Sequence, residues 1–154
     1  MDKRNDLDRI VVGVDGSASS VNALTYAADL AEKLELPLEA VTVWSYPPFA
    51  DHYLEVEWSP EDDATRVLED TVREAFGADV PARFTSTVLS GTPAHALIER
   101  SASSSMLVLG SRGRGGLAGL LLGSVCSTCA SHAHCPVLIV REPADLADRV
   151  GGYS

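Results

Sequence analysis

Short apolar runs rich in β-branched residues alternate along this chain with segments whose apolar residues recur at helical spacing. The first run, Ile10 to Val14, has no polar side chain, as expected for a strand that is covered on both faces. Further strands are expected at Leu38–Trp44, Met106–Leu109 and Val137–Val140. This alternation is typical of stacked βα units around a parallel sheet.

Helix-start signals follow the expected strands. Ser17 is suited to cap a helix, and Ser59 and Thr92 each combine a capping side chain with a proline directly after it. The helices are expected to run from Ser17 to Leu34, from Ser59 to Gly77, from Thr92 to about Ala102 and from Ser124 to about Ala133.

One further strand, from Ala82 to Ser90, is polar on both faces, which predicts an edge position in the sheet. The five strands with right-handed helical crossovers predict an open α/β sheet with helices on both faces. We expect one domain over residues 1–154, with a core of about 9–141, a polar N-terminal arm and a C-terminal tail. Ligands of such sheets bind beyond the carboxyl ends of the strands, where the strand order reverses.

Charge is distributed unevenly along the chain. Residues 51–79 contain ten acidic residues and two arginines, whereas residues 100–141 contain four arginines and no acid. Because sequence-independent nucleic-acid binding relies on Lys and Arg that neutralise phosphates, the formal net charge of -10 argues against a nucleic-acid partner. A small anion held by the basic segment is compatible with this distribution.

Nothing in the sequence indicates export or membrane insertion. The three cysteines are an odd number, and the first residues carry no apolar leader. The longest apolar runs fall well short of the ~20 residues that a membrane span needs. We therefore expect no membrane association and a cytoplasmic location.

The segment from Gly110 to Val125 is rich in glycine and follows an expected strand. Glycines let main-chain amides approach a phosphate closely, and Ser124 begins a helix whose N-terminus favours negative charge. The alternative is a flexible glycine loop without a ligand. The Gly-Lys-Ser/Thr of a P-loop is missing, and Gly113-x-Gly115-x-x-Ala118 is displaced from where a dinucleotide fingerprint belongs.

Three segments in order resemble the universal stress protein family. Gly110-x2-Gly113-x9-Gly123-Ser124 resembles its ATP-binding signature, Ile10 to Ser17 resembles its opening strand and turn, and Cys135 to Val140 resembles its closing strand. Members of the family without the glycine signature generally do not bind ATP, and this chain has the signature.

The resemblance implies a sheet of strand order 3-2-1-4-5 with ATP across the ends of the first and fourth strands. Asp15, Gly16 and Ser17 would lie near ribose and phosphate, and Val43 would meet adenine. The resemblance places ribose and triphosphate against Gly110, Ser111, Arg112, Gly113, Gly123, Ser124 and Val125.

Asp15 allows two interpretations. Its carboxylate would repel a triphosphate unless a divalent cation intervenes, which predicts Mg²⁺ or Mn²⁺ between Asp15 and the phosphates. Alternatively, Asp15 forms an Asx turn that shapes the loop.

The sequence from Cys126 to Cys135 is rich in Cys and His. A zinc site would require the helix to break, because Cys126 and Cys129 lie one turn apart whereas Cys135 belongs to the next strand. A redox pair of Cys126 and Cys129 is a second possibility, and small buried core cysteines are the third and favoured one.

These observations predict a nucleotide-dependent regulatory module and not an enzyme, because no positioned base is recognisable in the sequence. A slow ATP hydrolase and an interaction module that does not use nucleotide are the alternatives. A homodimer is expected through Val137–Val140, which would otherwise be an unprotected apolar edge. The sequence does not identify a client protein.

Overall fold

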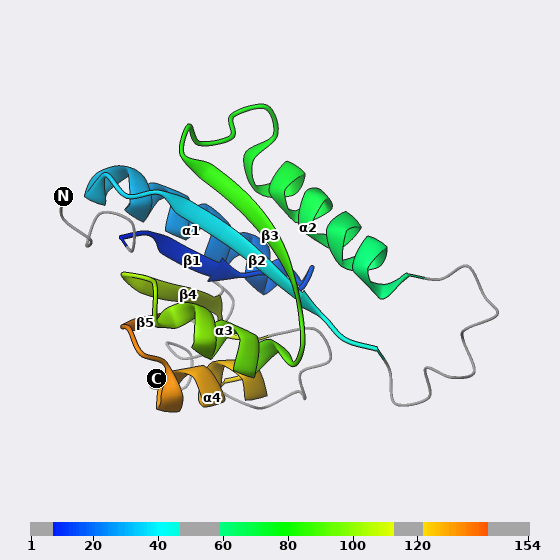
Figure 1. Ribbon diagram of the computed structural model, residues 1–154. Coiled ribbons are helices and arrows are strands. Elements are labelled where there is room, and N and C mark those ends of the chain that lie inside the picture. Colours follow the sequence, from blue (N-terminus) through cyan, green and yellow to red (C-terminus); the bar gives the residue numbers. More distant parts are fainter. Residues whose placement is uncertain (1–7, 47–58, 113–121, 142–154) are drawn as a thin grey trace, which may run out of the picture.

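The computed structural model describes residues 8–46, 59–112 and 122–141. Strands and helices alternate along these segments (Figure 1). In chain order they are β1 (Ile10–Gly13), α1 (Ala18–Leu34), β2 (Leu38–Trp44), α2 (Pro60–Phe76), β3 (Phe84–Ser90), α3 (Pro93–Ser101), β4 (Met106–Gly110), α4 (Ser124–His132) and β5 (Val137–Val140).

The strands form one parallel sheet in the order β3-β2-β1-β4-β5. The predicted strand order is therefore confirmed, and β3 lies at an edge as its polar pattern indicated. The strand order reverses at β1, so the helices that follow β1 and β4 pack on opposite faces of the sheet and leave a crevice beyond the carboxyl ends of these strands.

Helices cover both faces of the sheet (Figure 1). On one face, Ile10 and Val12 of β1 pack with Leu24 of α1 and Leu68 of α2. On the other face, Val11 packs with residues of α3 and α4, including Leu97 and Cys129. Successive residues of β1 thus point to opposite faces, which explains why this strand is apolar throughout.

Side-chain caps begin two of the helices at the predicted residues. The Ser17 hydroxyl accepts a hydrogen bond from the Ser20 amide at 3.1 Å, and the Ser59 hydroxyl accepts one from the Asp62 amide at 3.2 Å. Thr92 occupies the cap position of α3 without a side-chain cap hydrogen bond. The first helix ends at Leu34 as predicted, and the cap residue Glu35 adopts the left-handed backbone conformation.

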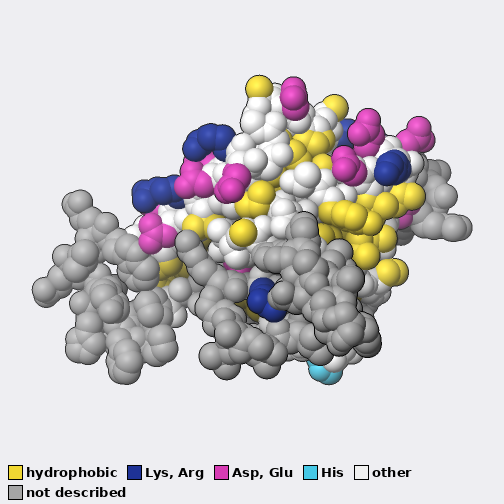
Figure 2. All heavy atoms as spheres, turned by 180° about the vertical axis from the view of Figure 1, so that it is seen from behind, with side chains coloured by type: hydrophobic (Ala, Val, Ile, Leu, Met, Phe, Trp, Pro, Cys, Tyr) yellow, Lys and Arg dark blue, Asp and Glu magenta, His cyan; other side chains and the backbone are white. Residues whose placement is uncertain are grey.

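The face covered by α1 and α2 carries many acidic side chains (Figure 2). The first turn of α2 alone contains Glu61, Asp62 and Asp63.

No helix in the described part of the chain is long and apolar enough to cross a membrane.

Candidate functional site

A cavity of about 410 Å³ lies beyond the carboxyl ends of β1, β2 and β4. Residues of α2, α3 and α4 complete its walls. This is the place that the reversal of strand order predicts for a ligand. The predicted site residues that line it are Asp15, Val43, Gly110, Arg112, Gly123, Ser124 and Val125.

Asp15 forms an Asx turn at the end of β1. Its Oδ1 accepts hydrogen bonds from the Ser17 amide at 3.0 Å and from the Ser17 hydroxyl at 2.5 Å. Gly16, which lies between Asp15 and Ser17, has a φ of 86°, a value that residues with a side chain rarely adopt. Gly16 and Ser17 are not among the lining residues of the cavity, so their observed part is to shape the turn that presents Asp15.

Gly110 brings the end of β4 against the first turn of α1. A Cβ atom at this position would lie 2.3 Å from the Ser19 Oγ and 2.6 Å from the Ser19 carbonyl oxygen. Ser19 is buried, and its hydroxyl accepts a hydrogen bond from the Arg112 amide at 3.3 Å. The glycine at 110 is therefore required by packing between β4 and α1, whatever the cavity binds.

Ser111, near the start of the glycine-rich segment, forms main-chain hydrogen bonds with two other parts of the fold. Its amide donates to the Val140 carbonyl at 3.0 Å, and its carbonyl accepts from the Gly123 amide at 2.9 Å. The side chain is fully buried and is not among the lining residues of the cavity. Ser111 thus connects β5 and the start of α4 rather than facing the cavity. Gly113, the remaining predicted contact, lies outside the described residues.

The N-terminus of α4 opens onto the cavity. Gly123 is the cap residue, and the first intrahelical hydrogen bond runs from the Ser127 amide to the Gly123 carbonyl at 3.0 Å. The amides of Ser124 and Val125 precede that bond and carry the positive end of the helix dipole. The first turn of α4 contains no acidic residue, so nothing in that turn offsets its attraction for an anion.

Cys126 is a packing residue at the wall of the cavity. Its thiol donates to the Gly110 carbonyl at 2.7 Å, and its side chain is buried. Burial, with smaller contributions from the charges of Cys129 and Asp15, raises the pKa of Cys126 to about 11. Such a thiol is almost entirely protonated at neutral pH and is a poor nucleophile.

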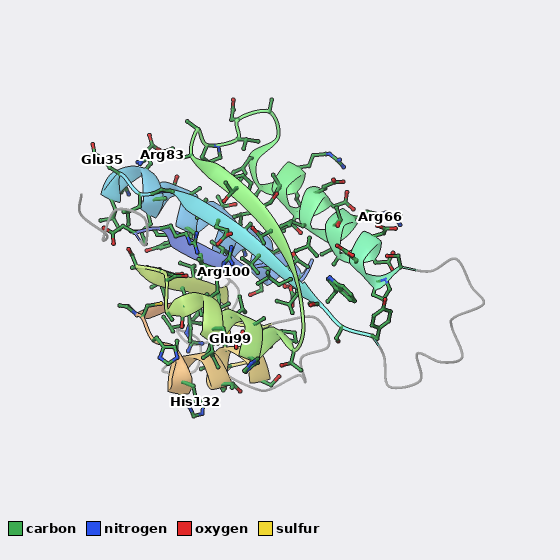
Figure 3. The ribbon with its side chains drawn as sticks, viewed as in Figure 1. Glu35, Arg66, Arg83, Glu99, Arg100 and His132 are labelled. Atoms are coloured by element: carbon green, nitrogen blue, oxygen red, sulfur yellow. The ribbon has the colours of Figure 1, made fainter. Side chains whose placement is uncertain are left out.

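The other residues of the Cys and His segment do not converge on a metal. Cys129 is fully buried, and burial raises the pKa of its thiol to about 11. His132 is exposed at the end of α4 (Figure 3). Within residues 8–46, 59–112 and 122–141, no group of three or more His, Cys, Asp or Glu side chains is placed to hold a metal ion. The burial of Cys126 and Cys129 confirms the prediction of core cysteines.

Sequence reasoning missed the walls that α2 and α3 contribute. Ala64 and Val67 were expected only as part of the helix from Ser59 to Gly77, and Asp63 only as one of the acids of residues 51–79. The apolar spacing places such residues on the inner face of a helix but does not say which of them border a cavity. The missed wall residues of α2 and α3 are Asp63, Ala64, Val67, Pro93 and Leu97, and those of the other elements are Gly13, Val14, Ser20, Val41, Thr42, Leu109 and Cys126.

This chain is similar in sequence and in fold to known proteins of one family. The model of the universal stress protein family matches residues 7–141. Universal stress protein Rv2623 of Mycobacterium tuberculosis (strain H37Rv) is 35% identical over 134 residues, which are 86% of this chain and 45% of that protein. The chain thus spans about half the length of the curated relatives it matches first.

Solved structures agree with this relationship. UspA from Lactobacillus plantarum is 23% identical, with a TM-score of 0.73, and the similarity covers 88% of this chain and 98% of that one. A universal stress protein described as a complex with cAMP is 28% identical, with a TM-score of 0.66, over 86% of this chain and 96% of that one. From the family model, the relatives and the shared five-stranded fold, we conclude that this chain belongs to the universal stress protein family.

Proposed function

We propose that this chain binds ATP in the cavity beyond β1, β2 and β4 and acts in the cytoplasm as a nucleotide-dependent regulatory module of the stress response. The observation that supports this most directly is the convergence of Asp15, Val43, Arg112 and the N-terminus of α4 on one cavity. Its volume of about 410 Å³ lies within the range of small-molecule sites.

The phosphates would lie at the end of the cavity formed by Gly110, Arg112 and α4. Main-chain amides at a helix N-terminus and a guanidinium both donate hydrogen bonds to phosphate oxygens. Charge-assisted hydrogen bonds contribute about 1.5–3 kcal/mol each. Four of them, before the costs of association, reach the range of about 8 kcal/mol that micromolar affinity requires. A lysine of the P-loop type is therefore not needed.

A divalent cation would accompany the nucleotide at Asp15. The described residues offer no complete protein site for a metal ion, so a cation would take most of its ligands from phosphate oxygens and water. Mg²⁺ is commonly held in this way, through one or two carboxylates together with substrate phosphates. Asp15 borders the cavity, and its Asx turn holds the carboxylate in a defined orientation. We propose Mg²⁺ or Mn²⁺ there, bridging Asp15 and the phosphates directly or through water.

Binding rather than turnover is the proposed role. A slow ATP hydrolase is one alternative, and steady hydrolysis with Mg²⁺ faster than about 1 s⁻¹, within the usual range of enzymes, would favour it. A module that interacts with proteins without using nucleotide is the other, and it predicts that no nucleotide is released when the purified protein is denatured. Mass spectrometry of that denatured sample distinguishes it from our proposal.

The experiment for the phosphate end compares two arginines. Arg112→Gln removes a guanidinium that borders the cavity, whereas Arg83→Gln removes an exposed one at the opposite end of the sheet (Figure 3). We expect Arg112→Gln to weaken ATP binding in equilibrium dialysis by about tenfold or more, the loss of one charge-assisted hydrogen bond. We expect Arg83→Gln to bind as the wild type does.

The result that contradicts the proposal is equal retention of ATP by both variants, or no retention by the wild type. The dialysis includes cAMP beside ATP, because a similar universal stress protein is described as a complex with cAMP. Tighter binding of cAMP than of ATP would replace the proposed ligand by a cyclic monophosphate.

A further inference from the structure

Thr42 of β2 carries a buried hydroxyl for which the described part of the chain supplies no hydrogen bond. The residue is 4% exposed, and its Oγ1 has no hydrogen-bond partner among the described residues. Two other buried hydroxyls, by contrast, bond to nearby backbone carbonyls: the Thr71 hydroxyl donates to the Val67 carbonyl at 2.8 Å and the Ser20 hydroxyl to the Ser17 carbonyl at 2.9 Å. A buried polar group without a partner costs free energy, so its presence calls for an explanation.

The position of Thr42 connects this hydroxyl to the cavity. Thr42 is one of its lining residues, together with Asp63, Ala64 and Val67 of α2. Along β2, Ala40 packs into the core on the α1 and α2 face, and Val41 packs on the opposite face. Side chains alternate along a strand, so Thr42 lies on the α1 and α2 face, toward the part of the cavity that α2 borders.

The charges at the two ends of the cavity differ in sign. Arg112 and the N-terminus of α4 make one end favourable to phosphates. At the other end, Asp63 borders the cavity in the acidic first turn of α2, which repels phosphates. A nucleotide therefore places its uncharged part beside α2, where Ala64 and Val67 offer apolar walls for a flat ring.

We infer that the Thr42 hydroxyl is a ligand-binding group that forms a hydrogen bond with the edge of the nucleobase. A threonine hydroxyl both donates and accepts, so it can pair with a ring nitrogen or with an exocyclic group. The inference rests on the proposed function of the cavity and assigns its α2 end to the base. On this inference the nucleobase supplies the hydrogen-bond partner that the described residues do not provide to the Thr42 hydroxyl.

The test uses two valine variants that are matched in burial. Thr42→Val removes the unsatisfied hydroxyl, and Thr71→Val removes one that is 3% exposed and already bonded. Isothermal titration measures binding of ATP with Mg²⁺ and of inorganic tripolyphosphate, which has no base. Thermal unfolding without ligand is measured for each variant.

We expect Thr42→Val to weaken ATP binding about three- to tenfold, the range of one neutral hydrogen bond, and to leave tripolyphosphate binding unchanged. Its unfolding midpoint without ligand should equal or exceed that of the wild type, because no bond is lost and the buried hydroxyl is gone. Thr71→Val should lower the midpoint and leave ATP affinity unchanged. Thr42→Ser, which keeps the hydroxyl, should bind ATP within about twofold of the wild type.

Two results overturn the inference while leaving the proposed function in place. In the first, Thr42→Val binds ATP as tightly as the wild type, which means that water or nothing pairs with the hydroxyl. In the second, it loses tripolyphosphate as strongly as ATP, which means that the residue acts through the fold. If the wild type binds no nucleotide at all, the proposed function fails and the inference fails with it.

Discussion

At the scale of single residues, the glycines of the site have distinct physical reasons for being there. Gly16 is needed for a positive φ in the Asx turn, and Gly110 is needed because β4 approaches Ser19 too closely for a side chain. Gly123 has an ordinary φ of -69° and serves as the cap of α4. The glycine pattern predicted a phosphate cradle, but at Gly110 the same residue is explained by helix packing alone.

Gly110→Ala is therefore expected to destabilise the fold and not only to weaken nucleotide binding. The added methyl group would meet backbone and side-chain atoms of Ser19, and overpacking of this kind costs about 1–3 kcal/mol. The measurement is the free energy of unfolding in urea without ligand. Gly123→Ala, whose φ of -69° is compatible with alanine, is the comparison and should cost less, about the difference between glycine and alanine as helix caps. Equal stability of Gly110→Ala and the wild type would contradict the packing argument.

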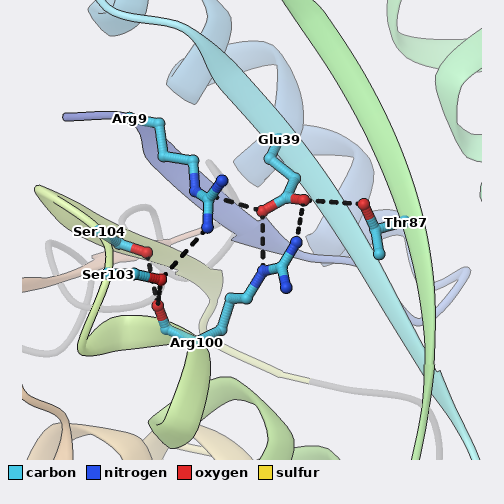
Figure 4. Close-up of polar contacts among 6 residues, drawn as sticks. All are labelled: Arg9, Glu39, Thr87, Arg100, Ser103 and Ser104. Carbon is cyan, nitrogen blue, oxygen red and sulfur yellow. Dashed lines mark hydrogen bonds and ion pairs between the residues drawn. The ribbon is translucent and has the colours of Figure 1, made fainter. Parts of the chain in front are cut away.

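At the scale of elements, a buried ionic cluster joins β2 to the residue before β1 and to α3 (Figure 4). Glu39 of β2 is 3% exposed. Its carboxylate accepts hydrogen bonds from the Arg100 guanidinium and from the Thr87 hydroxyl. The Arg9 Nε lies 3.5 Å from the Glu39 Oε1. Burial alone would raise the pKa of Glu39, but the bonds from Arg100 and Thr87 and the two positive charges together hold it below its ordinary value of 4.5. The cluster lies at the amino end of the sheet, away from the cavity.

Glu39→Gln is expected to lower the free energy of unfolding at pH 7 by about 2 kcal/mol or more, because it leaves two arginines without their carboxylate. Because the pKa of Glu39 is lower in the folded than in the unfolded protein, the ionised carboxylate stabilises the fold at pH values above the unfolded-state pKa. This stabilisation is lost as the pH falls through the folded-state pKa. The difference between variant and wild type should therefore shrink below about pH 4. Urea unfolding at pH 7 and pH 3.5 measures this, with the exposed Glu74→Gln as control. A difference that stays constant with pH would rule out the ionic explanation.

At the scale of the whole molecule, the edge formed by β5 is the proposed dimer interface. All four residues of β5 are partly exposed, and Tyr26 and Leu34 of the neighbouring α1 are 53% and 49% exposed. The Pro136 carbonyl accepts a hydrogen bond from Leu107 of β4 and the Val140 carbonyl accepts one from Ser111, the residue after β4. Because these groups alternate in direction along a strand, the Ile139 amide points outward. An outward row of amides beside apolar side chains favours pairing with a second copy.

Light scattering on an eluting peak should therefore give about twice the chain mass of 16.3 kDa. Ile139→Pro removes the outward amide and should yield a monomer that keeps its circular dichroism spectrum. Ser86→Pro makes the matched change on β3, the opposite edge of the sheet, and should remain dimeric. A monomeric wild type at micromolar concentration would remove the proposed interface.

The acidic character of the molecule was visible from the sequence, and Figure 2 shows where part of it lies in space. Acidic side chains are distributed over the face of α1 and α2, whereas Arg112 borders the cavity at the end of β4. The prediction that no nucleic acid is bound rests on the formal net charge of -10 and stays a prediction.

Much of the fold could be predicted from helix caps, turn residues and apolar runs, which are local features of the sequence. The capping residues Ser17 and Ser59, the proline at the start of α2 and the glycine at its end set the helix limits, and unbroken apolar runs set the central strands. These signals act over a few residues, so a sequence displays them directly. Asp15, Arg112 and Ser124 line one cavity, as the resemblance to universal stress proteins implied, and they can do so because parallel strands bring their carboxyl ends to the same edge.

Only the tertiary structure decided which side chains meet across elements. Glu39 with Arg100, Gly110 with Ser19, and Ser111 with both Val140 and Gly123 are pairs that no spacing rule connects. Nor could periodicity tell that Ala64 and Val67 border a cavity, or that no residue in the described ranges forms a hydrogen bond with the Thr42 hydroxyl. The physical reason is that burial and hydrogen bonding depend on the packing of every neighbour at once, whereas a sequence pattern records only the residues nearby along the chain.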